Sequence, residues 1–481
     1  MDHELQAGTN FAWSTFSQFF LRILGLAFFV LMSHILGDIG MGQYNFISSF
    51  VGMWFIFLDF GAGSHLYREW AKSPKTFDQV EGDFFALFTL RLITVVIIFI
   101  PFFLVNFFSN FNILLPLIIA FVSTFFATYI NLADTYFQSA NLFKYPSLRQ
   151  LIEKMVVIII GSVGLFFYPH VETVFVALLL SQLVSLAYYF YRVLPFKFKL
   201  IFNIHNILSM IKKGMPFLFI TLFISLYNRI DIVMLRYLDN FSVVGWYGTA
   251  YKFLEVAAIF PAVLFMPSIF PILSSLWNDS GSRVKFISFF YKATRLLFSF
   301  SLMITLGFIF FTPLLVSWLF PDSFMPSVLA IRILILAQII GSISMLFNSL
   351  LVIQHREHRS LYIIIFGAIF NIGLNFILIP RYSLYGAAWA TVIAEVANLF
   401  LLQRYAQWEK NWSIIYRMVF LGVFNALLLL ILKYIGQSNN YFIGFALCLI
   451  NVGLLFWLRL LKKEDLTFFF NPFIVKFNSL F

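Results

Sequence analysis

Long apolar stretches separated by short polar segments run along almost the whole chain. Most of these stretches reach the roughly 20 apolar residues that a helix needs to cross a bilayer. They lack the alternating pattern of a membrane β-barrel, so the pattern predicts transmembrane α-helices. The fourteen stretches lie near residues 11–36, 41–63, 84–107, 113–134, 151–168, 172–192, 214–236, 243–273, 294–318, 327–352, 361–379, 385–406, 414–434 and 441–461.

Composition agrees with this pattern and excludes a soluble domain. Of the 481 residues, 61% are hydrophobic and only 11% are charged, and the mean hydropathy is +0.92. The segment before the first stretch lacks a basic region, and the stretch itself is long, which favours a retained helix over a cleaved signal peptide. Cys448 is the one cysteine, so neither a disulfide framework nor a thiolate metal site is expected.

The distribution of basic residues predicts the topology. The net charge of +11 could suggest a nucleic-acid partner, but 24 of the lysines and arginines fall in alternate loops and the C-terminal tail, against three in the intervening loops. The positive-inside rule then predicts fourteen spans with both termini cytoplasmic; twelve or thirteen spans stay open, since the fifth and eleventh stretches are short and the eighth is long. The predicted outside loops are only a few residues long, which leaves no room for an extracytoplasmic catalytic domain, and a phosphate-binding G-x-x-x-x-G-K-[ST] motif is absent.

A weak internal repeat predicts two lobes. Leu36-Gly37-Asp38 followed by Gly42-Gln43-Tyr44 is similar to Leu238-Asp239 followed by Gly245-Trp246-Tyr247. Two halves of six helices each would be related by an axis along the membrane normal. We therefore expect a six-helix lobe at 1–200, a second at 201–410, and two extra helices with a cytoplasmic tail at 411–481.

Short motifs resemble those of a known transporter family. Asn10, Trp13, Leu58-Asp59-Phe60-Gly61 and Arg68-Glu69 are similar to the opening of Wzx-type polysaccharide (O-antigen) flippases. These belong to the MOP superfamily, together with the MATE multidrug exporters and the lipid II flippases. Further similarity lies in Arg229-Ile230-Asp231, Gly245-x-Tyr247 and Tyr385-Gly386-Ala387-Ala388-Trp389-Ala390. The fourteen predicted spans depart from the twelve of many members and are closer to the lipid II branch.

The resemblance implies an all-α, MATE-like fold and a transport function rather than an enzyme. It implies that helices one, two, seven and eight line a central cavity. The expected activity is ion-coupled alternating access that moves undecaprenyl-pyrophosphate-linked glycans from the inner to the outer leaflet of the bacterial inner membrane, for O-antigen, capsule or exopolysaccharide. The partners would be membrane lipids, the lipid-linked oligosaccharide and a polysaccharide polymerase or export machinery, without nucleic acid.

Four ionisable residues are predicted to lie near the bilayer midplane. With a rise of about 1.5 Å per residue, Arg22 lies about 17 Å from the inner end of its helix and Lys252 about 14 Å from the outer end. Glu255 is one turn deeper than Lys252, and Glu395 is about 15 Å into the twelfth stretch. Ionisable groups at such depth are functional hypotheses.

Shallower charges have a structural interpretation as well. Arg91 and Arg332 are close enough to a helix end for their side chains to reach the headgroups, and Asp59 is expected to cap or pair locally. Arg229 and Asp231 are two residues apart, so they should not face each other, whereas Lys252 and Glu255 are three apart and can touch. A neutral ion pair and a cavity role are both open for Lys252 and Glu255.

These depths lead to a predicted site. A pyrophosphate needs compensation by arginine or lysine, so we expect Arg22, Arg229 and Lys252 to bind the substrate together with Asn228. The midplane set is almost neutral, however, and its acids can instead couple a proton or a sodium ion. Glu255 is the first choice for that role, followed by Asp231 and Glu395. No resident cofactor or metal is expected, since a solvated cluster is the better interpretation of His355-Arg356-Glu357-His358.

Four other functions stay open at this point. A MATE-like multidrug or cation antiporter and a lipid II-type flippase would use the same fold. A membrane glycosyltransferase or polymerase would need a large outside loop, which the pattern lacks. A scaffold without transport would leave the deep charges without a purpose.

Overall fold

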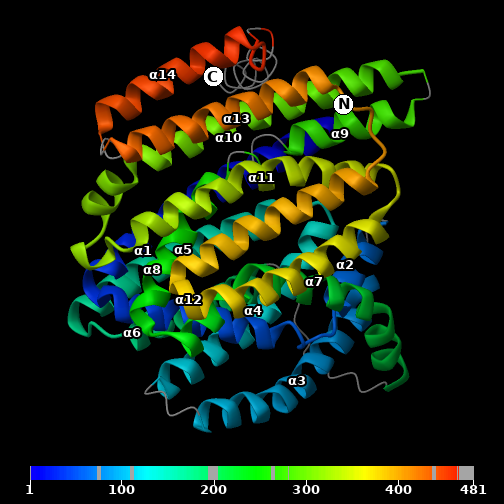
Figure 1. Cartoon of the computed structure of the whole chain (residues 1–481). Coiled ribbons are helices and arrows are strands. Elements are labelled where there is room, and N and C mark those ends of the chain that lie inside the picture. Colours follow the sequence, from blue (N-terminus) through cyan, green and yellow to red (C-terminus); the bar gives the residue numbers. More distant parts are fainter. Residues whose placement is uncertain are drawn as a thin grey trace. The chain divides into compact units, whose positions relative to one another are not determined.

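The computed structural model describes residues 2–72, 77–108, 113–192, 204–259, 261, 266–279, 281–435, 440–462 and 464, and over these ranges its regular secondary structure is helical (Figure 1). The helices are α1 (Asp2–Phe55), α2 (Ala62–Ala71), α3 (Phe77–Phe108), α4 (Leu114–Ser139), α5 (Lys144–Phe167), α6 (Val171–Arg192), α7 (Ile204–Leu238), α8 (Phe241–Ala257), α9 (Met266–Asn278), α10 (Arg283–Leu319), the 3₁₀ turn η2 (Asp322–Phe324), α11 (Ser327–Ile353), α12 (Glu357–Tyr405), α13 (Trp412–Tyr434) and α14 (Tyr441–Trp457).

The length and composition of these helices identify a multi-pass membrane protein. Ten of them are long and apolar enough to cross a bilayer, and α14 is a shorter apolar helix. Two of the ten, α1 and α12, contain a kink and hold two predicted stretches each. The all-α membrane fold predicted from the sequence is therefore confirmed. Among the basic residues used for the topology, a few lie outside the described residues: Lys75, Lys197, Lys199, Lys463 and Lys476.

The first kink lies at Gly37, which adopts φ 64° and ψ −171°. Beyond it, the second apolar stretch was predicted to reach Gly63, but the helix ends at Phe55. A turn follows in which Phe60 (φ 50°) and Gly61 (φ 77°) have left-handed backbone conformations that cannot continue a helix. The ten-residue helix α2 begins directly after this turn.

Two further features concern the later predicted stretches. The eighth stretch, predicted as one span, contains α8, which ends at Ala257, and the beginning of α9 at Met266; residues 260 and 262–265 between them lie outside the described residues. The second kink lies at Ser383 in α12 (φ 52°, ψ −134°). There the Ser383 hydroxyl donates a hydrogen bond to the Asp239 carboxylate.

Two compact units make up the chain. The first consists of Met1–Gly248 with Asn375–Leu384, and the second of Thr249–Leu374 with Tyr385–Phe481. The first unit extends past residue 200 because α7 packs against α1 and α2. The two six-helix lobes, defined by the repeat in the sequence, stay a prediction.

Within the first unit, the two copies of the repeated glycine motif pack against each other. A Cβ atom at Gly42 would lie 1.8 Å from the Phe241 carbonyl oxygen, and one at Gly245 would lie 2.2 Å from the Asp38 carbonyl oxygen. Each glycine thus lets the other helix approach at backbone distance, as small residues do in membrane helix pairs. The core of this unit is built from large side chains of α2, α3 and α6, including Trp70, Phe85 and Tyr189.

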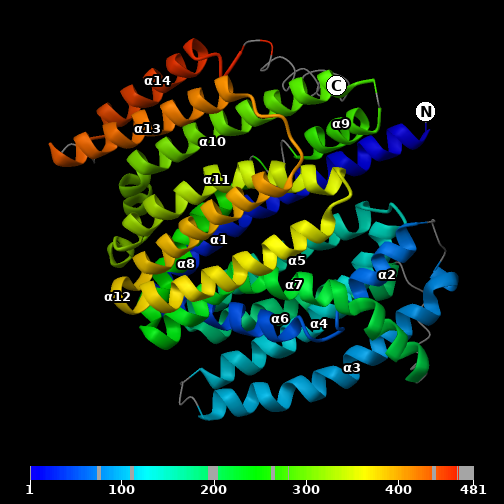
Figure 2. The same cartoon turned by 45° about the vertical axis from the view of Figure 1, so that its right-hand side comes forward.

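The second unit is held by apolar packing and neutral polar contacts. In both views α13 and α14 lie side by side next to α10 (Figures 1 and 2). Asn425 and Asn451 join α13 to α14 through two reciprocal amide hydrogen bonds of 2.8 and 2.9 Å. At the start of α14, the Asn440 side chain accepts bonds from two backbone N–H groups and caps the helix.

Candidate functional site

Arg22 lies in the first part of α1 and is half-buried. One turn further along α1, Gly25 packs against α5: a Cβ atom added to Gly25 would lie 3.3 Å from Lys154 Nζ. Residues three apart share a helix face, so Arg22 is on the side of α1 that faces Lys154. Lys154 therefore reaches the contact between α1 and α5, and Arg22 lies one turn away on α1.

Lys154 is a residue that the sequence prediction missed. It was counted with the inside loop, although the predicted apolar stretch 151–168 already includes it near its start. The helix α5 begins earlier, at Lys144, so Lys154 lies ten residues, or about 15 Å, inside it. The available signal was Pro146, which is compatible with the first turn of a helix, followed by a run without a helix breaker.

Asp231, Asn228 and Arg229 lie close together in α7 but in different surroundings. Asp231 is 1% exposed and accepts hydrogen bonds from the Tyr247 hydroxyl and, at 2.8 Å, from the Ile232 backbone N–H. Arg229 and Asn228 are exposed. The difference in exposure agrees with the prediction that Arg229 and Asp231 do not face each other.

Lys252 and Glu255 form the ion pair that their spacing predicts. Lys252 Nζ lies 2.8 Å from Glu255 Oε2, and the two side chains are 29% and 41% exposed. Glu395 is half-buried on α12, and a Cβ atom at Gly341 of α11 would lie 3.8 Å from its Oε2. These residues belong to the second unit and Arg22 to the first, so a shared cavity stays a prediction.

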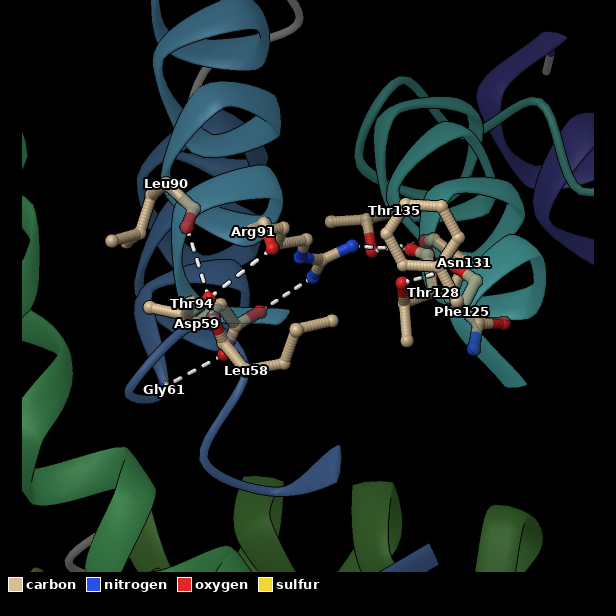
Figure 3. Close-up of polar contacts among 10 residues, drawn as sticks. All are labelled: Leu58, Asp59, Gly61, Leu90, Arg91, Thr94, Phe125, Thr128, Asn131 and Thr135. Atoms are coloured by element: carbon tan, nitrogen blue, oxygen red, sulfur yellow. Dashed lines mark hydrogen bonds and ion pairs between the residues drawn. The ribbon is translucent and has the colours of Figure 1, made fainter. Parts of the chain in front are cut away.

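A second charged cluster of the first unit is centred on Arg91 of α3. Its Nη2 forms an ion pair with Asp59 Oδ2, and its Nη1 donates to the Thr128 carbonyl of α4. Figure 3 shows the Arg91 side chain reaching from α3 to the backbone of α4, with Asp59 beside it in the turn after α1. The other Asp59 oxygen accepts from the Gly61 backbone N–H at 2.9 Å, and Thr94 donates to the Leu58 carbonyl.

This cluster fastens the turn between α1 and α2. A Cβ atom at Gly63 would lie 2.8 Å from Asp59 Oδ2 and 3.0 Å from Arg91 Nη2, so the absence of a side chain there makes room for the ion pair. Arg91 is 7% exposed; the expectation that it reaches the headgroups is wrong, because Asp59 and Thr128 satisfy it internally. Arg332 likewise donates to a carbonyl, that of Ile309, at 2.7 Å.

The most extensive charged network lies between α4, α5 and α6, which are neighbours in the first unit. Arg149 is bidentate on Asp134, with Nε 3.1 Å from Oδ1 and Nη2 2.8 Å from Oδ2. Its Nη1 also bonds to Glu153 Oε2. The Tyr189 hydroxyl donates to Asp134, and Gln182 Nε2 donates to Glu153 Oε1 at 3.1 Å.

Metal binding and pKa shifts add little to these clusters. Among the described residues, no group of three or more His, Cys, Asp or Glu side chains could hold a metal ion. Outside the membrane-spanning helices, burial lowers the pKa of His65 in α2, and a hydrogen bond from Lys72 lowers the pKa of the Glu69 carboxyl.

The sequence matches a family model described as polysaccharide biosynthesis protein over residues 7–277, more than half of the chain. The chain belongs to this family. The family resemblance seen in the sequence motifs is thereby confirmed.

A curated relative and solved structures are similar to this member of the polysaccharide biosynthesis family. It is 26% identical over 278 residues to the uncharacterized membrane protein MJ1375 of Methanocaldococcus jannaschii; the match spans 55% of this chain and 64% of the relative's length. A solved structure of the lipid II flippase MurJ in an inward closed conformation is similar with a TM-score of 0.69 and 17% identity, over 96% of this chain and 99% of that one.

A second type of solved structure shares the fold. An inward-facing multidrug resistance MATE transporter of the MOP superfamily has a TM-score of 0.62 and 12% identity, over 80% of this chain and 96% of that one. At such low identity these likenesses establish the fold alone. Together with the family, they support a membrane flippase or transporter.

Proposed function

We propose that this protein moves a lipid-linked oligosaccharide bearing a diphosphate across the membrane. The observation that supports the proposal is the position of Lys154: its Nζ would lie 3.3 Å from a Cβ atom at Gly25 of α1, one turn from Arg22, within apolar helices. Cations are costly within a membrane, and a diphosphate group would add anionic charge beside them. Arginine can bind it through two parallel hydrogen bonds, and lysine adds a second point charge.

The family and the fold make this the best supported substrate class. The chain belongs to a polysaccharide biosynthesis family, and a solved structure similar to 96% of it is described as a lipid II flippase. The proposal includes alternating access, an undecaprenyl carrier, an O-antigen, capsule or exopolysaccharide unit as cargo, and a polymerase or export machinery as the recipient. It also includes an inner-membrane location with cytoplasmic termini and no enzymatic step.

The other predicted binding residues have different parts in this proposal. Arg229 and Asn228 are exposed on α7 and are proposed to contact the glycan or its phosphates. Lys252 is neutralised by Glu255 at 2.8 Å, so its contribution to anion binding is proposed to be smaller than that of Arg22.

Proteoliposomes with a fluorescent lipid-diphosphate oligosaccharide in both leaflets provide the test, because movement between leaflets changes the fraction accessible to an added quencher. Losing a hydrogen bond to a charged group costs about 1.5–3 kcal/mol, so Arg22→Ala and Lys154→Ala are each expected to slow transport by about ten- to a hundredfold. Lys144→Ala, at the exposed start of α5, is the matched control.

Unchanged transport in both variants would overturn the assignment of these two cations. Export of a cationic dye by wild-type protein that leaves the lipid-linked glycan in place would instead favour the multidrug antiporter.

A further inference from the structure

An aromatic cavity of about 270 Å³ lies between α3, α4 and α6 of the first unit. Phe84 and Phe88 line it from α3, Phe125 and Tyr129 from α4, and Phe190 from α6. The described residues around it carry no charge, and their only polar side-chain atoms are two tyrosine hydroxyls. An apolar cavity of about 150 Å³ can hold one benzene molecule, so this cavity has room for roughly ten carbon atoms.

The cavity is continuous with the surface that faces the lipid. Phe190 lines it and is 40% exposed, and Ile93, which follows the lining residue Leu92, is 42% exposed. The three helices that enclose the cavity are each long and apolar enough to cross a bilayer. Hydrocarbon chains of the membrane are therefore the molecules that reach this cavity, and the question is which kind of chain fits it best.

The wall of the cavity is held in place before any chain enters. The Tyr189 ring lines the cavity, and its hydroxyl donates to Asp134, which also bonds to Arg149 at 2.8 Å. The Tyr129 ring packs between Phe88 and Phe125, with centroid distances of 4.5 and 4.8 Å. Side chains fixed in this way lose little further freedom when a ligand binds, which favours a specific site over a loose filling by lipid.

The Tyr129 hydroxyl distinguishes between kinds of hydrocarbon. Tyr129 is 8% exposed, and within the described part of the chain its hydroxyl is buried without a hydrogen-bond partner. A buried donor without an acceptor is costly. A saturated chain offers this hydroxyl no acceptor, whereas the π electrons of a double bond are a weak one. The hydroxyl therefore favours an unsaturated chain.

We infer that this cavity binds the polyprenyl chain of the lipid carrier. The inference rests on the proposed function, which supplies a polyprenyl-linked substrate. Each five-carbon prenyl unit contains a double bond and a methyl branch, so about two units match the volume of the cavity. The double bonds also make the chain stiffer than a saturated acyl chain of equal length, so it loses less conformational entropy on binding.

Photoaffinity labelling of the full chain in lipid nanodiscs tests this inference. The probe is undecaprenyl phosphate with a diazirine at the free end of its chain. A phosphatidic acid with a saturated chain and the same terminal diazirine is the matched comparison, because both probes carry a phosphate head. Mass spectrometry locates the labelled residues. The polyprenyl probe is expected to label the cavity residues of α3, α4 and α6 about fivefold more than the saturated probe does.

Two variants with one control connect the labelling to the cavity. Ala133 lines the cavity from α4 and is buried, so Ala133→Phe fills it and is expected to reduce labelling by the polyprenyl probe about tenfold. Ala187→Phe adds the same ring at an exposed position of α6 and should leave labelling unchanged. Tyr129→Phe preserves the ring and should reduce the preference for the polyprenyl probe about twofold.

Several outcomes would overturn the inference. Equal labelling by the two probes would assign the cavity to bulk lipid, and displacement of the polyprenyl probe by a cationic dye would assign it to a drug. Undiminished labelling in Ala133→Phe would place the chain elsewhere, and an unchanged preference in Tyr129→Phe would refute the role of the hydroxyl. Labelling is measured without transport, so a protein that binds the polyprenyl probe but moves no lipid-linked glycan would contradict the proposed function and leave this site in place.

Discussion

The two compact units differ in the kind of polar group that they bury. Among the described residues, the buried charged side chains are Arg91, Asp134, Arg149 and Asp231, and all four lie in the first unit. In the second unit the buried polar contacts are made by amides and hydroxyls, such as Gln338 with Ser301 and Ser342. Charged groups there, such as Lys252 and Glu255, keep about a third of their side-chain surface exposed.

This difference separates two uses of polar groups within a membrane protein. Neutral amides and hydroxyls join helices without any dependence on pH. Buried ion networks join helices too, but their strength depends on protonation and on every partner being present. The ion network around Arg149 in the first unit therefore depends on each of its charged partners, whereas the buried amides and hydroxyls of the second unit do not titrate.

The largest effect is expected for Arg149→Met. This change leaves Asp134 and Glu153 buried without their cation, and the removal of one partner of a buried ion network costs about 3–5 kcal/mol. Unfolding in mixed micelles with increasing dodecyl sulfate measures the loss of free energy. Arg149→Lys, which keeps the charge but not the fork of hydrogen bonds, should lose less. If Arg149→Met loses less free energy of unfolding than Asn451→Leu, the distinction between the two units is wrong.

A smaller loss is expected for Asp59→Asn. Arg91 keeps its bond to the Thr128 carbonyl but loses its charged partner, and hydrogen bonds to charged groups contribute about 1.5–3 kcal/mol. The same unfolding measurement applies, with Glu69→Gln in the exposed pair of α2 as the control that should not change stability. If both variants unfold alike, the ion pair in Figure 3 does not fasten the turn.

Asn451→Leu in the second unit should cost about 1 kcal/mol, since hydrogen bonds between membrane helices contribute about 0.6–2 kcal/mol. Asn425 retains its bond to the Leu421 carbonyl, which limits the loss. The loss should be the same at acidic and neutral pH, because neither amide titrates. A clear pH dependence of this loss would contradict the neutral character assigned to these contacts.

The smallest effect is expected for Lys252→Met, at less than about 1 kcal/mol, because partly exposed ion pairs of this type contribute little to stability. The variant is informative when stability and transport are measured together. A large loss of transport at unchanged stability would show that Lys252 belongs to the substrate path. A loss of stability as large as that of Arg149→Met would instead place Lys252 among the structural ions.

The sequence predicted the features that depend on neighbours along one helix. The apolar stretches, the contact between Lys252 and Glu255 and the separate faces of Arg229 and Asp231 all follow from helical spacing. The kinked helices also agree with the stretches, because Gly37 and Ser383 lie where the apolar pattern pauses. The proposed roles of Arg22, Glu395 and the other site residues stay predictions.

Contacts between distant segments could not be predicted in this way. Asp59 and Thr128 lie 32 and 37 residues from Arg91 along the chain, and hydropathy contains no information about such pairs. Lys154 was missed because it was counted with the inside loop, although it lies within the predicted stretch 151–168; the helix α5 begins seven residues before that stretch, at Lys144. Helix ends are determined by capping and packing, and an average of hydropathy over a window does not detect either of them.

The kink at Gly37 has a consequence for chirality. Its φ of 64° disfavours an L-residue by about 1–2 kcal/mol, yet the site where a Cβ would stand has no atom within 4 Å. The obstacle is therefore handedness rather than space. The mirror image of this backbone conformation is an ordinary extended one, so a D-alanine built into position 37 by chemical synthesis would fit, whereas its L-enantiomer would bend the chain away from the kink.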